Sequence, residues 1–206
     1  MRYLNVVFDI DGTLINSEKA VLKSLQKTIL EVKGLKMNLK DLKFSLGIPG
    51  KDALLKLNIE NIEKVEHMWN EYFNEYLDDI KLFDGIKETI QKLKSKSIKL
   101  GIITSQTRKE YETIFMRFNL DNYFDVVICA DDTIKHKPEG EPMEKYLNLA
   151  NAKREKTVYI GDSIYDMKCA KNAGVDSVLA LWGRDDSNIE ATYKLNSPKD
   201  ILTLLI

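Results

Sequence analysis

The chain has 206 residues, of which 31% are charged and 44% hydrophobic, as is usual for a globular protein. That length is enough for one sizeable core and a smaller inserted unit. Its formal net charge of −1 provides no overall field that would attract nucleic acid or an anionic membrane, so we expect neither as a partner.

The first predicted element is a strand in the apolar run 4–8. It stops at Asp9-Ile10-Asp11-Gly12-Thr13, which places two carboxylates two residues apart. Alternate side chains of a strand point the same way, so Asp9 and Asp11 can serve one site. Two acids at the carboxyl end of a strand, followed by a glycine turn, favour a magnesium and phosphate site, with a simple acidic turn as the alternative.

Helical spacing replaces the strand pattern in the next part of the chain. Apolar residues recur at helical intervals, namely Ala20, Val21, Leu25, Ile29 and Val32, then Val65, Met68, Trp69, Tyr72 and Phe73. We therefore predict an all-helical domain over residues 16–82, inserted into a second domain formed by residues 1–15 and 83–206. Linkers are expected near 16–18 and 81–85, where Gly85 provides conformational freedom.

From Ile98 onward, short apolar runs alternate with amphipathic stretches. Strands are expected at 98–103, 126–129, 157–160 and 176–180. This alternation predicts an α/β domain whose parallel sheet is covered by helices on both faces. The first of these strands ends at Thr104 and the third ends next to Asp162, so we expect both residues at the same sheet edge as Asp9.

Four motifs, in this order along the chain, resemble those of the haloacid dehalogenase superfamily of phosphotransferases. They are Asp9-Ile10-Asp11-Gly12-Thr13, Thr104-Ser105, Lys137-Pro138, and Gly161-Asp162-Ser163 with Asp166. The first and fourth motifs are specific, whereas the second and third are weak alone. The resemblance covers most of the chain and implies a Rossmann-like parallel sheet core with a helical cap between the first and second motifs.

The resemblance also implies roles for the acids. Asp9 is the expected nucleophile, which forms a covalent phosphoaspartate, and Asp11 is expected to protonate the leaving oxygen and later deprotonate the attacking water. Because nucleophile and substrate are both anionic, Mg²⁺ is the expected cofactor, held by Asp9, the backbone carbonyl of Asp11, and Asp162. Asp166 is expected to support the metal or to hold Lys137; stabilising its own helix is the alternative.

The phosphoryl oxygens are expected to be bound by Thr104, the adjacent Ser105, and Lys137. Ser105 competes with Thr104 for this role, and either residue can instead cap a helix. Lys135 competes with Lys137, which we prefer because Pro138 follows it as in the family motif.

Substrate choice is expected to come from the helical domain, because the core recognises only the phosphoryl group. The loop Gly47-Ile48-Pro49-Gly50-Lys51 is the best candidate for this task. Its glycines allow a tight turn, and Lys51 can meet an anionic leaving group, so Gly47 and Lys51 are predicted to bind substrate. A plain interhelical loop is the alternative.

These observations predict a Mg²⁺-dependent phosphatase for a small phosphorylated metabolite, resembling the phosphoglycolate phosphatase and pyrophosphatase branches. Asp11 argues against a dehalogenase, which lacks the second acid. A sugar phosphomutase like β-phosphoglucomutase, an inorganic pyrophosphatase, and a scaffold that binds a partner without catalysis stay open. The mutase often has a branched apolar residue where this chain has Thr13.

The two cysteines lie in an apolar run and in a helix-like stretch, so we expect buried, inert thiols and no disulfide framework. The sequence shows neither a signal-peptide pattern nor an apolar run of membrane length. We therefore expect a cytoplasmic protein, either a monomer or a homodimer.

Overall fold

The computed structural model describes residues 2–46, 48, 50–183 and 188–205. The chain divides into two compact units, one formed by Met1–Ile15 and Leu82–Ile206 and the other by Asn16–Lys81. We call them the core unit and the helical unit. A short two-stranded sheet, made of β2 (Ile15–Asn16) and β3 (Lys81–Leu82), lies where the chain passes from one unit to the other.

The core unit is built on a six-stranded sheet in the order β5-β4-β1-β6-β7-β8, and every pairing in it is parallel. Its strands are β1 (Asn5–Phe8), β4 (Lys99–Ile103), β5 (Val126–Ile128), β6 (Thr157–Gly161), β7 (Asp176–Ala180) and β8 (Tyr193–Leu195). This arrangement confirms the predicted α/β fold class. The edge strand β8 was not expected, because Tyr193–Leu195 has a lysine at its centre and lacks the continuous apolar run that marks β5, which is equally short.

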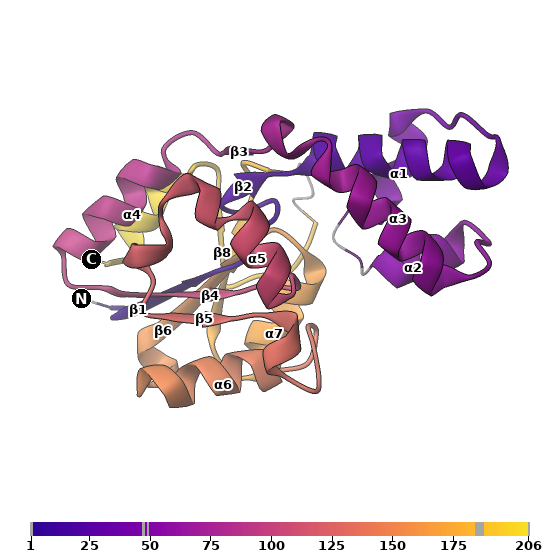
Figure 1. Cartoon of the computed structure of the whole chain (residues 1–206). Helices are drawn as coiled ribbons and strands as arrows, with labels where there is room; N and C mark the ends of the chain where they lie inside the picture. The colour runs from indigo at the N-terminus through magenta and orange to yellow at the C-terminus, as the bar shows by residue number, and fades with distance from the viewer. Residues whose placement is uncertain (1, 47, 49, 184–187, 206) are drawn as a thin grey trace. The chain divides into compact units, whose positions relative to one another are not determined.

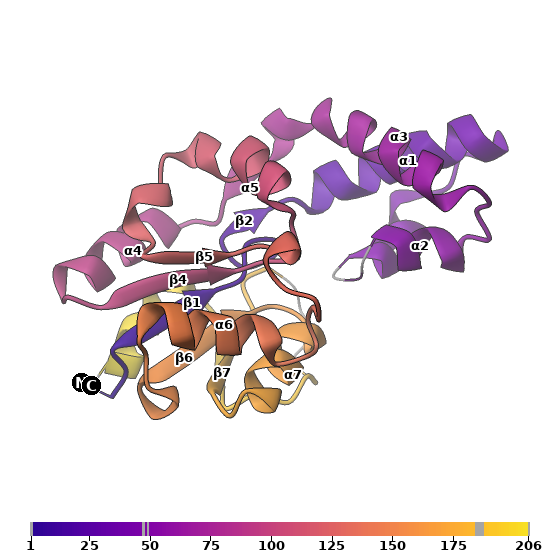
Figure 2. The ribbon, with the colours of Figure 1, turned by 60° about the horizontal axis from the view of Figure 1, so that its bottom comes forward.

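Helices cover both faces of this sheet. Figure 1 and Figure 2 show α6 (Glu141–Ala150) and α7 (Ile164–Asn172) on one face, and α4 (Ile86–Ser95) and α5 (Arg108–Ile114) on the other. All four residues of β1 are buried, as a central parallel strand requires. Cys129 and Cys169 are buried free thiols, as predicted.

Shorter 3-10 segments complete the core unit. They are η3 (Met116–Phe118), η4 (Asp121–Tyr123), η5 (Ala130–Asp132), η6 (Arg154–Lys156) and η7 (Pro198–Leu205). The last of these packs beside α4.

The helical unit consists of α1 (Glu18–Lys33), η1 (Leu39–Ser45), α2 (Gly50–Lys56), α3 (Ile62–Asn74) and η2 (Leu77–Asp79). Its own apolar core includes Leu25, Leu54 and Trp69. The Trp69 indole N–H donates a hydrogen bond to the hydroxyl of Ser24 at 2.9 Å, so the one polar group of this buried side chain has a partner. No helix among the described residues is long and apolar enough to cross a membrane.

Candidate active site

Three adjacent strands end at the candidate site. Phe8 of β1 is level with Ile102 of β4 and with Ile160 of β6. The residues that follow these strands, Asp9, Thr104 and Asp162, are therefore brought to one edge of the sheet. All three are buried, with exposed fractions of 6%, 4% and 3%. The strands β4 and β5 lie on one side of β1, and the strands that follow them, β6, β7 and β8, lie on its other side. A ligand crevice is typical of such a switch point in an open parallel sheet.

Lys137 joins this edge from the loop before α6. Its Nζ donates to Asp9 Oδ1 at 2.8 Å and to Asp166 Oδ1 at 2.7 Å, and its side chain is only 6% exposed. Burial alone would lower the pKa of Lys137, but the charges of Asp166 and Asp9 outweigh it and raise that pKa above its usual value. Lys135, the competing cation, is exposed.

Asp166 is held on both of its carboxylate oxygens. Oδ1 accepts hydrogen bonds from Lys137 Nζ and, at 2.9 Å, from the Tyr159 hydroxyl. Oδ2 accepts from the Ser163 backbone N–H at 3.0 Å and from the Ser163 hydroxyl at 2.5 Å. Burial opposes ionisation, but Lys137 and Ser163 together hold the pKa of Asp166 below its usual value. Asp166 is therefore an ionised, firmly oriented partner for Lys137.

Our sequence reasoning did not single out Tyr159, and it named Ser163 only as part of the fourth motif, without a role. The spacing Ser163-x-x-Asp166 is that of a helix capping box, and both halves of the box are present at the start of α7. That spacing could have identified Ser163. Tyr159 gives no comparable signal, since an aromatic residue in an apolar strand normally belongs to the core.

The three acids form a compact group with the chemistry of a hard-cation site. Single carboxylate oxygens of Asp9, Asp162 and Asp166 all lie within 4.8 Å of one another. With Lys137, the ionised group carries a net charge of −2 in a buried setting. Burial raises the pKa of Asp9, although Lys137 opposes this effect. Oxygen donors and an excess of negative charge fit a divalent cation such as Mg²⁺.

Two glycines make room for these acids. A Cβ on Gly12 would lie 2.2 Å from Asp162 Oδ2, and one on Gly161 would lie 2.4 Å from the Cβ of Asp166. Gly12 also has a φ of +78°, which side chains rarely adopt. The glycine after the first acid pair therefore lets the fourth motif approach the loop that follows β1.

Gly12→Ala is expected to lower the free energy of unfolding by about 3 kcal/mol or more, because a strained backbone and a clash with Asp162 combine. Gly85→Ala is the matched control, since Gly85 has a φ of +84° and no atom within 4 Å of the added carbon. It should cost only about 1 kcal/mol. Denaturant unfolding of both variants checks this, and equal losses would contradict the account of Gly12.

Asp11 is half-buried, and its carboxylate accepts a hydrogen bond from Gln106 Nε2 at 2.8 Å. The backbone N–H of Gln106 donates to Thr104 Oγ1 at 3.1 Å, which leaves the Thr104 hydroxyl proton to point elsewhere. Gln106 thus links the first and second motifs. Neither its spacing nor its type predicts this contact.

The segment before residue 184 packs against the same loop. Trp182 Nε1 donates to the carbonyl oxygen of Thr13 at 2.8 Å. A Cβ on Gly183 would lie 2.3 Å from the carbonyl oxygen of Gly12, so only glycine fits there. The indole therefore helps to hold the loop that carries Asp11.

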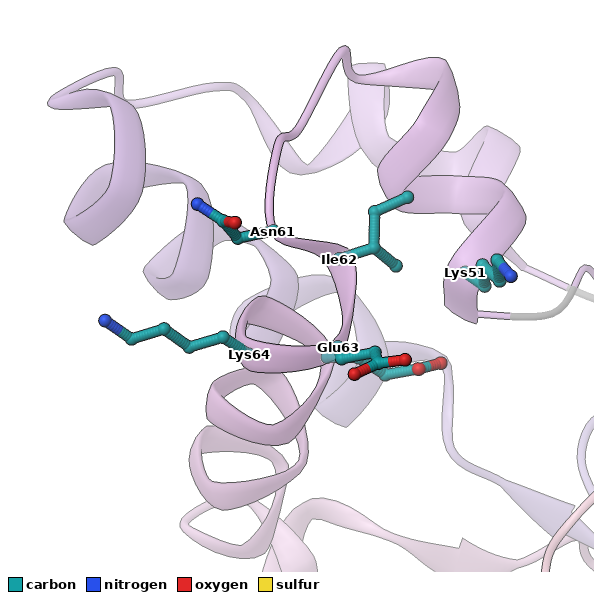
Figure 3. A pocket seen from close by; sticks show the side chains of 6 residues that line it. Lys51, Asn61, Ile62, Glu63 and Lys64 are labelled. Atoms are coloured by element: carbon teal, nitrogen blue, oxygen red, sulfur yellow. The ribbon is translucent and has the colours of Figure 1, made fainter.

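The remaining predicted substrate residues are either exposed or outside the described residues. Ser105 is exposed beside Thr104. Lys51 is exposed at the start of α2 in the helical unit, on the wall of a surface pocket of about 370 Å³ (Figure 3). Asn61, Ile62, Glu63, Lys64 and Glu66 complete the lining of that pocket. Gly47 lies outside the described residues.

Comparisons with known proteins identify the family of this chain. The family model described as haloacid dehalogenase-like hydrolase matches residues 6–180. Pyrophosphatase PpaX of Halalkalibacterium halodurans is 31% identical, over 100% of this chain and 98% of that protein. Pyrophosphatase PpaX of Bacillus mycoides is 30% identical, with the same coverage of 100% and 98%.

Solved structures show the same likeness. A Lactobacillus plantarum protein assigned as a phosphoglycolate phosphatase has a TM-score of 0.91 and 31% identity, covering 99% of this chain and 100% of that one. A Thermotoga maritima protein assigned as a β-phosphoglucomutase has a TM-score of 0.81 and 25% identity, with 98% and 97% covered.

Proposed function

Because the chain belongs to the haloacid dehalogenase-like hydrolase family, we propose that it is a Mg²⁺-dependent phosphatase that acts on a small phosphorylated metabolite through a phosphoaspartate at Asp9. The observation that carries this proposal is the buried contact of Asp9 with Lys137, close to Asp162 at the end of the adjacent strand and to Asp166 in the first turn of α7. A carboxylate that is buried, oriented and paired with a cation has what a nucleophile toward an anionic substrate needs.

In the first step, a carboxylate oxygen of Asp9 attacks phosphorus and the bond to the leaving oxygen breaks. Asp11 supplies a proton to that oxygen, and Lys137 offsets the repulsion between the two anions. In the second step, Asp11 removes a proton from a water molecule that attacks phosphorus, which releases phosphate and restores Asp9. One residue serves as acid and then as base, as a two-step transfer demands.

Thr104 is the proposed donor to the phosphoryl oxygens, because the Gln106 N–H already occupies an acceptor site of its hydroxyl. Ser105, which is exposed in the same turn, is proposed to bind the same group from the solvent side. Asp166 is proposed to act through Lys137 more than as a direct metal ligand, since each of its oxygens already accepts two hydrogen bonds.

Asp9, Asp162 and the backbone carbonyl of Asp11 would hold Mg²⁺. When bound, the ion supplies positive charge between the nucleophile and the phosphoryl group.

Magnesium is expected to stabilise the protein against unfolding, because it neutralises part of the net charge of the three-acid group. At a concentration near 100 times the dissociation constant the gain is about 2.7 kcal/mol. Asp162→Asn should remove most of this gain. Glu112→Gln, which changes an exposed acid of α5, should keep it. Thermal unfolding with Mg²⁺ and with chelator checks this; a native midpoint unaffected by Mg²⁺ would contradict the proposed site.

Two substrates have specific support. Phosphoglycolate is favoured by the similar Lactobacillus plantarum structure, and pyrophosphate by full-length relatives named pyrophosphatase PpaX. Lys51, and Gly47 before it, are the residues that we propose for contact with the leaving group. The β-phosphoglucomutase alternative rests on the Thermotoga maritima structure.

Phosphate release from phosphoglycolate, pyrophosphate and sugar phosphates, with Mg²⁺ and with chelator, tests the proposed function. Isomerisation of glucose 1-phosphate is followed in parallel. Hydrolysis of one compound far above the others would identify the substrate. Isomerisation without net phosphate release would favour the mutase, and hydrolysis that does not need magnesium would contradict the proposed cofactor.

We propose the cytoplasm as the compartment of this protein, which fits its two free thiols.

A further inference from the structure

Gln106 is a buried polar residue between the first and second motifs. It is 7% exposed, and its backbone is fixed on both sides. The N–H donates to Thr104 Oγ1, and the carbonyl oxygen accepts from the Ala130 N–H at 2.8 Å. From this fixed backbone, the side chain reaches Asp11 Oδ2 with its amide nitrogen at 2.8 Å.

The side-chain carbonyl of Gln106 has no hydrogen-bond partner among the described residues, although it is buried. The ionised form of Asp11 can only accept hydrogen bonds, so the amide turns its N–H toward Asp11 and its oxygen away. When Asp11 is protonated, the oxygen without the proton still accepts from this N–H, and the O–H is left to donate to the leaving oxygen. A buried acceptor without a hydrogen bond costs free energy, so its presence needs a reason. The reason here is the contact between the amide nitrogen of Gln106 and Asp11.

We propose that Gln106 is a positioning residue, which holds the Asp11 carboxyl group in the orientation from which it protonates the leaving oxygen. This inference rests on the proposed function, in which Asp11 is the acid and base. A general acid must come within hydrogen-bond reach of its target, and a displacement of about 1 Å can cost about 10²-fold in rate.

The proposal predicts an effect that depends on the leaving group. An alkyl phosphate releases a strongly basic alkoxide, which needs a proton from Asp11. The p-nitrophenolate ion is a weak base and departs without one. Misplacing Asp11 therefore slows the transfer from an alkyl phosphate far more than from p-nitrophenyl phosphate. A merely structural defect would slow both transfers equally.

Gln106→Met tests this directly, since it keeps the length of the side chain and removes the donor. We expect kcat/KM to fall about 30-fold to 100-fold for an alkyl phosphate and less than about 3-fold for p-nitrophenyl phosphate. Gln106→Glu, which turns an acceptor toward Asp11, should show at least the same selectivity. The parameter kcat/KM is chosen because it reports the first transfer, in which the leaving group departs.

Gln91→Met is the matched control. Gln91 is an exposed glutamine of α4 whose Nε2 also donates to a side-chain oxygen, that of Tyr123, at 3.3 Å. It should leave both kcat/KM values unchanged. Thermal unfolding of each variant shows whether it folds, and Gln106→Asn, one methylene shorter, replaces Gln106→Met if that variant does not.

The outcomes separate this inference from the function on which it rests. If the native protein hydrolyses no phosphate ester, the proposed function fails. If the native protein is active and Asp11→Asn is selective for alkyl phosphates, but the Gln106 variants lose activity uniformly or not at all, the positioning role is overturned. If Asp11→Asn itself shows no selectivity, the acid role of Asp11 fails, and the role of Gln106 with it.

Discussion

Asp9→Asn is expected to lower kcat by about 10⁴-fold or more with every phosphate substrate, because a neutral amide cannot form the acyl phosphate. The amide oxygen keeps the shape of the side chain and can still accept from Lys137, which now contacts Asp9 Oδ1 at 2.8 Å. Steady-state turnover in the presence of Mg²⁺ measures the loss.

The same substitution should leave the stability of the fold intact. Asp9 is one of three acids that lie close together, of which Asp9 and Asp166 form ion pairs with Lys137. Burial raises the pKa of Asp9, so removing its charge relieves repulsion as well as breaking an ion pair. We expect the free energy of unfolding to stay within about 1 kcal/mol of the native value. Asp131→Asn is the exposed control and should keep full activity. If Asp9→Asn kept full activity, with contaminating phosphatase excluded, the assignment of Asp9 as the nucleophile would be wrong.

Lys137→Met is expected to reduce both turnover and stability. Turnover should fall about 10³-fold, because the variant loses a cation that contacts the nucleophile. The free energy of unfolding should fall by about 3 to 5 kcal/mol, since Asp9 and Asp166 stay buried without their shared ammonium. Lys135→Met, two residues earlier in the same loop and exposed, should change neither quantity appreciably.

The stability loss in Lys137→Met should depend on pH. In the native protein the folded pKa of Asp166 lies below its unfolded value, so its contribution is present at neutral pH and is lost as pH falls through that lowered pKa. Without Lys137, burial raises the pKa of Asp166 in the folded state, and protonation of Asp166 then favours the folded state. The difference in the free energy of unfolding between the native protein and Lys137→Met should therefore become smaller as pH falls from 7 toward 4. A difference independent of pH would show that the loss comes from packing.

The motif residues that share the sheet edge could be predicted because acids and hydroxyls at strand ends leave a local pattern. Asp9, Thr104 and Asp162 each follow an apolar run, and the parallel order of those runs decides that they meet. The contacts of Gln106 and Tyr159 could not be predicted in this way. Gln106 reaches Asp11, and the Tyr159 hydroxyl donates to the carbonyl oxygen of Ile103 as well as to Asp166, so each side chain has a partner far away in the sequence. A polar group in a turn or an aromatic ring in a strand has many possible partners.

The specificity determinants were the least predictable part. Lys51 was inferred from a glycine-flanked loop, and it lines a pocket to which two lysines and two glutamates contribute, namely Lys51, Lys64, Glu63 and Glu66. Such a mixed lining does not select one anion by charge alone. If Lys51 contacts the leaving group as proposed, selection of one substrate would need shape and further contacts, which residue type does not encode.

The central claim is that Asp9 carries the phosphoryl group between the two steps. The measurement that tests it most directly is an acid quench within the first turnovers on phosphorus-labelled p-nitrophenyl phosphate, followed by peptide mapping. We expect the label on the peptide that contains Asp9, and no label on the protein in Asp9→Asn. The labelled protein should release phosphate with a rate constant at least as large as kcat. Phosphate released at the full rate while no label reaches the protein, or label on another residue, would contradict this account.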